Sequence, residues 1–183
     1  MKAVKFVTII LLILSISASA KDFRSNQPLL ITAAGQSQDV TIVKILAQKA
    51  GLKFSFDKLV KTDQLKDHAT LVFVTGGSTK GLGAANIDKD QELERVNSLI
   101  EAAKKAKMAI VTMHVGGSSR RGKLSDEFNK LTAENADCLI IVRSGDEDKL
   151  FSKIAGEKKI PIFLIDKIFE AEDVLKKIFV DKK

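Results

Sequence analysis

Six short apolar segments alternate with amphipathic stretches, and this alternation constrains the fold more than any other feature of the chain. The apolar segments are Leu29–Ala33, Lys53–Phe56, Leu71–Thr75, Ala109–Met113, Cys138–Val142 and Pro161–Ile165. Most are apolar at nearly every position, as strands covered on both faces must be. The pattern predicts a single α/β domain with a three-layer, doubly wound, mostly parallel six-stranded sheet, Rossmann-like or flavodoxin-like.

Helical periodicity fills most of the intervals between these segments. Apolar stripes occur at Val43, Leu46, Ala47 and Ala50; at Leu93, Val96, Ile100 and Ala103; at Leu124, Phe128 and Leu131; at Leu150, Ile154 and Ala155; and at Ile168, Ala171, Val174, Leu175 and Ile178. Asp88 with Gln91 resembles a capping box, whereas the polar segment 58–67 is a weak helix or a loop. Right-handed crossovers place every strand-to-helix loop on one edge of the sheet, where ligands bind in such folds.

The first twenty residues have the three parts of an export signal. Lys2 and Lys5 precede the apolar run Phe6–Ile16, and Ala18–Ala20 supplies the small residues of a cleavage site. The run is shorter than the ~20 residues of a membrane-spanning helix. We expect a signal peptide over 1–20, cleavage after Ala20, a single domain over 21–183, no stable membrane anchor and a periplasmic or secreted location. A retained N-terminal anchor is the alternative.

Charge and composition bear on partners and cofactors. The formal net charge is +7, and removing Lys2 and Lys5 leaves 7 − 2 = +5. Without Trp or Tyr, and with lysines spread along helices, nucleic acid is not an expected partner. The single Cys138 is interpreted as a core thiol. His68 and His114 have no neighbouring ligands at metal spacing, so we expect no metal and no cofactor.

The loop after the first strand begins Gly35-Gln36-Ser37. Gly35 permits a tight turn, and Ser37 can cap the helix that follows. A helix N-terminus in this position attracts anions through its free N–H groups. A simple capped helix with no ligand is the competing interpretation.

The segment 76–87 after the third strand contains four glycines, two hydroxyl side chains and a lysine. Its length without a regular pattern favours a functional loop or a flexible connection. Its backbone amides could surround an oxyanion. Neither a Walker loop nor a Gly-x-Ser-x-Gly nucleophile elbow is present, since Leu82 and Lys80 occupy the defining positions.

The segment 114–122 after the fourth strand combines His114 with Ser118, Arg120 and Arg121. Arginines beside small residues suit bidentate recognition of carboxylate or phosphate. A surface arginine pair with a packed histidine is the plainer alternative. If the third and fourth strands are neighbours, we expect Lys80, Arg120 and Arg121 to face one cleft.

Residues 76–85 and 113–122 together resemble an uncharacterised bacterial family of exported, Rossmann-like proteins that form a domain of unknown function. The start of the family's mature domain is similar to Leu30–Ser37 here, and the resemblance covers essentially the whole mature chain. It implies a fold and an exported location but no activity.

Three functional hypotheses follow from these loops. The first is a binding protein for a small anion of the phosphate or carboxylate type. Its predicted ligand-binding residues are Gly35, Ser37, Gly76, Gly77, Ser78, Thr79, Lys80, Gly116, Gly117, Ser118, Arg120 and Arg121. The second is a hydrolase or transferase with His114 as acid or base and Ser78 or Ser118 as nucleophile. The third is an interaction module without a small ligand, whose protein partner the sequence does not indicate, so enzymatic activity stays undecided.

Overall fold

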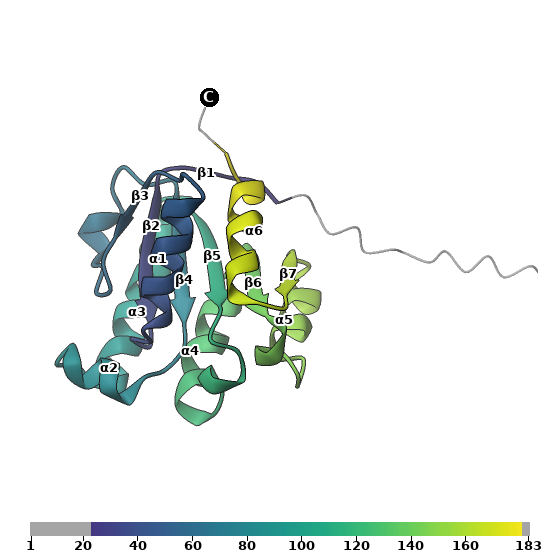
Figure 1. Cartoon of the computed structure of the whole chain (residues 1–183). Coiled ribbons are helices and arrows are strands. Elements are labelled where there is room, and N and C mark those ends of the chain that lie inside the picture. The colour runs from purple at the N-terminus through teal and green to yellow at the C-terminus, as the bar shows by residue number, and fades with distance from the viewer. Residues whose placement is uncertain (1–22, 181–183) are drawn as a thin grey trace, which may run out of the picture.

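The computed structural model describes residues 23–180, and its centre is a sheet of six parallel strands (Figure 1). The strands are β2 (Leu29–Ala34), β3 (Phe54–Phe56), β4 (Thr70–Thr75), β5 (Ala109–His114), β6 (Cys138–Val142) and β7 (Ile162–Ile165). Each coincides with one of the six predicted segments to within one residue at either end. The predicted α/β fold class is therefore confirmed.

Strand order in the main sheet is β3-β2-β4-β5-β6-β7. If the six strands of this sheet are numbered 1 to 6 along the chain, their spatial order is 2-1-3-4-5-6. This is the flavodoxin-like arrangement, in which the order reverses between strands 1 and 3. The reversal lies between β2 and β4 here. Strands β4 and β5 are direct neighbours, with Thr70 opposite Ala109, as the loop argument required.

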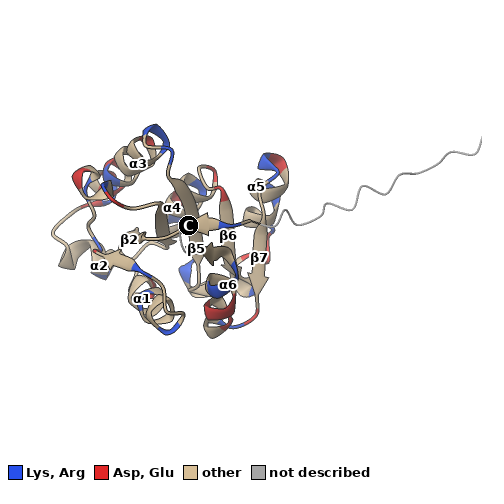
Figure 2. Ribbon diagram, turned by 90° about the horizontal axis from the view of Figure 1, so that it is seen from above, with Lys and Arg blue, Asp and Glu red and all other residues tan. Residues whose placement is uncertain are grey.

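Helices cover both faces of the sheet. They are α1 (Asp39–Lys49), α2 (Thr79–Ala84), α3 (Lys89–Lys105), α4 (Lys123–Ala133), α5 (Leu150–Lys158) and α6 (Ala171–Ile178). Seen along the sheet, α1 and α6 lie on one face, and α3, α4 and α5 lie on the other (Figure 2). The capping box predicted at the start of α3 is present, because Asp88 Oδ1 accepts the Gln91 N–H at 2.8 Å.

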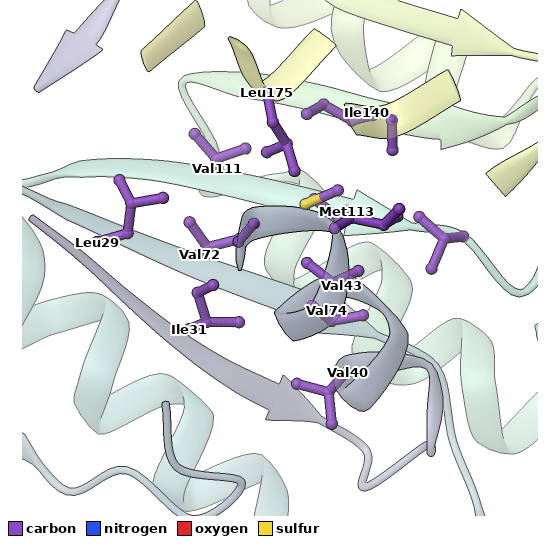
Figure 3. Close-up of a cluster of buried hydrophobic side chains, with 14 of the residues drawn as sticks. Leu29, Ile31, Val40, Val43, Val72, Val74, Val111, Met113, Ile140 and Leu175 are labelled. Carbon is purple, nitrogen blue, oxygen red and sulfur yellow. The ribbon is translucent and has the colours of Figure 1, made fainter. Parts of the chain in front are cut away.

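Alternation along the strands divides the core into the two faces of the sheet. In β2, Leu29 and Ile31 pack toward α1 and α6, whereas Leu30 packs toward α3. Figure 3 shows side chains from α1 and α6 resting on the first of these faces, with Val43 and Leu175 above the sheet. Burial on both faces explains why the strands are continuously apolar.

A small second sheet closes the amino edge, away from the strand-to-helix loops. Strand β1 (Ser25–Asn26) pairs in parallel with β8 (Phe179–Val180). The hydroxyls of Ser25 and Thr70 are 2.6 Å apart, which joins this pair to the start of β4. The predicted signal peptide lies outside the described residues. No helix within residues 23–180 is long and apolar enough to cross a membrane.

Candidate functional site

The loops after β2 and β4 are hydrogen-bonded to each other where the strand order reverses. The Ser78 N–H donates to the Gly35 carbonyl at 2.8 Å, and Gln36 forms an antiparallel bridge with Gly77. A Cβ at Gly35 would lie 2.7 Å from the Gly76 carbonyl oxygen, so only glycine permits this approach. At the reversal of strand order, the two loops are therefore in direct backbone contact.

The expectation of an irregular loop over 76–87 is wrong, because the segment contains α2. Ser78 is its N-cap, and the Ser78 Oγ accepts the Gly81 N–H at 3.1 Å. Thr79 and Lys80 are exposed in the first turn of α2. Lys80 has no ion-pair partner within residues 23–180. The glycine-rich composition of this segment did not predict a helix, because α2 is stabilised by its N-cap and by tertiary packing.

His114 ends β5 completely buried. Its Nε2 lies 3.1 Å from the Gly117 carbonyl oxygen, and its ring packs against Phe151 with centroids 4.9 Å apart. Gly145 lies so close that a Cβ there would collide with the imidazole. Burial lowers the pKa of His114, and the Gly117 hydrogen bond opposes this shift. The imidazole is sealed from solvent, a position that does not suit a general acid or base.

The serine hydroxyls at this edge serve local structure. Ser37 Oγ accepts the N–H of Asp39 at 3.1 Å and donates to Asp39 Oδ2 at 2.6 Å. The N-cap of α1 is Gln38, without a side-chain cap hydrogen bond, so Ser37 does not cap the helix as predicted and instead bonds locally to its first residue. Ser118 is exposed. Within residues 23–180, neither Ser78 nor Ser118 is hydrogen-bonded to His114. The structure therefore does not bring together the nucleophile and base of the hydrolase hypothesis.

Arg120 and Arg121 both have carboxylate partners. Arg120 Nε donates to Asp39 Oδ2 at 3.1 Å, across the end of β4. Arg121 donates to Asp126 at 2.7 Å and to Asp148 at 2.8 Å. The bond to Asp148 and that to Asp126 raise the pKa of Arg121, and the Arg121 bond lowers the pKa of Asp148 to about 2. The arginines thus tie loops together, and neither is free of a counter-charge.

A buried ion pair between Glu92 and Arg95 of α3 holds the loop that follows β2. Glu92 is 0% exposed, and its Oε1 accepts the Gly35 N–H and the Gln36 Nε2–H, each at 2.9 Å. Arg95 binds both oxygens of this carboxylate at 2.8 Å. Sequence reasoning missed this pair, since an acid in the first turn of a helix ordinarily complements the helix dipole in solvent. The three-residue spacing of Glu92 and Arg95 was the available signal.

One pocket opens at the carboxyl edge beside these loops, with a cavity volume of about 240 Å³. We name it the edge pocket, and its lining residues are Gln36, Gln38, Lys58, Leu59, Gly81, Ala84 and Ala85. Lys58 Nζ donates to Gln38 Oε1 at 2.9 Å. Two of the three predicted loops border this pocket. None of the individually predicted ligand-binding residues lines it, and Lys58 belongs to a segment that was interpreted only as a weak helix or loop.

The part of the chain that the structure describes contains neither a metal-binding cluster nor a reactive thiol. No group of three or more His, Cys, Asp or Glu residues is arranged there to hold a metal ion. Cys138 is fully buried in β6, and burial raises the pKa of its thiol to about 12. A thiol with so high a pKa is almost entirely protonated at neutral pH and therefore a poor nucleophile.

Comparisons with known proteins give distant likenesses only. No curated protein matches the chain. A GDSL-like lipase from Bacteroides thetaiotaomicron has a TM-score of 0.35 and 14% identity, over 73% of this chain and 65% of that one. A putative acylhydrolase from Bacteroides fragilis has a TM-score of 0.33 and 13% identity, over 73% and 64%. The chain thus spans just under two thirds of the length of each.

A third solved structure, the SGNH-hydrolase family esterase AlinE4, has a TM-score of 0.31 and 11% identity, over 81% of this chain and 78% of that one. Scores at this level carry no argument about function. A family model matches residues 26–179 and includes both loops on which the sequence resemblance rests. The chain belongs to the family described as a domain of unknown function, DUF6305.

Proposed function

We propose that this domain is a binding module that captures a small anion in the edge pocket. The observation that carries the proposal is that arginines near the carboxyl edge are paired with carboxylates, whereas the one cation that lines the edge pocket is not. Arg95, Arg120, Arg121 and Arg143 each form a salt bridge with a carboxylate. Lys58 lines the pocket and has no carboxylate partner within residues 23–180. Its charge is therefore available to a ligand.

The surroundings of Lys58 support this role. An ammonium group has three N–H donors, and only one of them is engaged, by the side chain of Gln38. The residue as a whole is half-buried, whereas the Nζ–Gln38 hydrogen bond is exposed, so the ammonium can be reached from solvent. The edge pocket also adjoins the reversal of strand order between β2 and β4, the usual ligand region of doubly wound sheets.

Charge over the rest of the molecule favours a small ligand over a polymer. Basic and acidic residues are interspersed along the helices on both faces of the sheet (Figure 2). A nucleic-acid surface would require lysines and arginines concentrated on one face or groove. The edge pocket, by contrast, offers a single unpaired cation in a small volume.

Thermal unfolding with anions tests the proposal. We expect phosphate, sulfate or acetate, at fixed ionic strength, to raise the melting temperature of the 21–183 chain by mass action. Lys58→Met should abolish the increase. Lys66→Met, at an exposed lysine without an ion-pair partner within residues 23–180, is the matched control and should keep it. Equal stabilisation of parent and Lys58→Met would contradict the site, and no stabilisation by any anion would favour an interaction module.

We also propose that the chain is exported and cleaved after Ala20, which leaves a mature N-terminus at Lys21. The basic start, apolar run and small residues of 1–20 support this proposal. Intact-mass measurement of the extracytoplasmic fraction should give the mass of residues 21–183. Replacing Ala18 and Ala20 by Arg, as the control, should prevent this cleavage. A full-length chain confined to the cytoplasm would refute export.

A further inference from the structure

Gln36 is a buried polar residue that lines the edge pocket and has one side-chain atom without a hydrogen-bond partner within residues 23–180. The residue is only 3% exposed, yet it lines the pocket. Its side-chain Nε2 donates twice, to Glu92 Oε1 at 2.9 Å and to the Lys58 carbonyl at 3.1 Å. Both partners are pure acceptors, so the nitrogen must face them. The amide orientation is thereby fixed, and the Oε1 atom has no donor among the described residues.

The backbone of Gln36 supports a functional interpretation of this placement. Its φ angle is 61°, in the left-handed region that side chains other than those of Asn and Asp seldom adopt. Such strain persists where surrounding contacts hold it, and it often marks ligand sites. The buried Glu92–Arg95 pair provides those contacts. The acceptor is thus held in position before any ligand arrives.

The other residues that line the edge pocket disfavour some classes of anionic ligand. Leu59, Ala84 and Ala85 offer apolar contact. Ala84 and Ala85 also belong to the C-terminal end of α2, whose dipole opposes a dianion more strongly than a monoanion. A phosphate dianion would therefore have one ammonium and few other donors to compensate it. A free amino acid would place its ammonium beside Lys58, in a pocket with no lining carboxylate.

We propose that the edge pocket binds a small hydroxycarboxylate, an inference that rests on the proposed anion site. The carboxylate binds the Lys58 ammonium, the hydroxyl donates to Gln36 Oε1, and a short aliphatic part contacts Leu59. The carboxylate satisfies the charge, and the hydroxyl satisfies the fixed acceptor. A cavity of about 240 Å³ is large enough for a small hydroxycarboxylate.

Matched ligands separate this inference from the proposed function. Titration calorimetry of the 21–183 chain should give tighter binding of 2-hydroxybutanoate than of butanoate, by about tenfold, because butanoate leaves the Gln36 acceptor unpaired. Inorganic phosphate should bind more weakly than 2-hydroxybutanoate. Equal affinity of the two acids, or tighter phosphate binding, would overturn the inference and leave an anion site. Binding of none of the three would overturn both.

Two variants test whether Gln36 and Lys58 cause the preference for 2-hydroxybutanoate over butanoate. Gln36→Met should reduce the ratio of the two affinities to within about twofold, and Lys58→Met should weaken both acids. Retention of the tenfold ratio by folded Gln36→Met would exclude Gln36 as its source. Should Gln36→Met fail to fold, the ligand comparison on the parent chain decides the inference without it.

Discussion

A single histidine at the end of β5 illustrates how a residue suited to catalysis can be a packing residue. His114 is enclosed by Gly117, Gly145 and Phe151, and its Nδ1 has no hydrogen-bond partner within the described residues. A cationic imidazole there would be poorly solvated. Protonation should therefore cost folding free energy.

We expect this histidine to make the free energy of unfolding pH-dependent. Burial lowers the pKa of folded His114 and the Arg121 charge adds to this shift, whereas the Gly117 hydrogen bond and the Asp39 charge oppose it without reversing it. The ordinary pKa of a histidine is near 6.5. The unfolded state thus binds more protons as the pH falls below 6.5, and stability is lost there, by at most about 1.4 kcal/mol per pH unit. Urea unfolding from pH 7.5 to 5 measures this slope.

The variant pair His114→Leu and His68→Gln isolates the contribution. His114→Leu should flatten the slope below pH 6.5 whatever its absolute stability, because the titrating group is gone. His68→Gln removes the other histidine and is the control. Its free energy of unfolding should still fall below pH 6.5, because His114 is retained. Superimposable slopes for parent and His114→Leu would show that the buried imidazole does not titrate in this range.

Among the elements, α2 determines the shape of the edge pocket. Gly81 faces the loop after β2, and a Cβ there would overlap the Gln36 carbonyl, whereas a Cβ at Gly83 would meet nothing within 4 Å. Two glycines in one short helix therefore have different roles. Gly81 permits close packing of α2, and Gly83 only costs helix stability.

Alanine at these two glycines should shift stability in opposite directions. Gly81→Ala should lower the free energy of unfolding by about 1–3 kcal/mol, because the backbone of Gln36 must move. Gly83→Ala should raise it by about 0.5–1 kcal/mol through helix propensity. Chemical denaturation measures both. A stabilising Gly81→Ala would mean that α2 is not packed as the structure has it.

At the scale of the whole molecule, the strands were predictable, whereas the pocket was not. Apolar runs such as Cys138–Val142 are strong signals because both faces of the sheet are covered. The edge of the sheet followed from crossover handedness. Which residues open onto a cavity depends on tertiary contacts between segments far apart in sequence, so neither Lys58 nor Glu92 could be singled out.

The placement of α2 and of the arginine pairs has the same explanation. Ser78 was a candidate ligand, and its capping of Gly81 requires a helix that glycine-rich composition disfavours. Arg121 was a candidate anion site, and its partner Asp148 lies 27 residues away, in the loop before α5. Sequence placed the candidate residues at the carboxyl edge of the sheet, and packing determined which of their charges were neutralised there.

The pairing of β1 with β8 has a practical consequence for orientation. It brings residues 26 and 180 side by side at the amino edge. Helix α2, which lines the edge pocket, lies at the opposite edge, beyond the carboxyl end of β2 (Figure 1). Strands of six residues separate the two edges by roughly 20 Å. A surface or sensor chip coupled next to residue 26 or residue 180 would therefore face away from the pocket, and a short linker between these two positions would permit a circular permutant with this edge of the sheet intact.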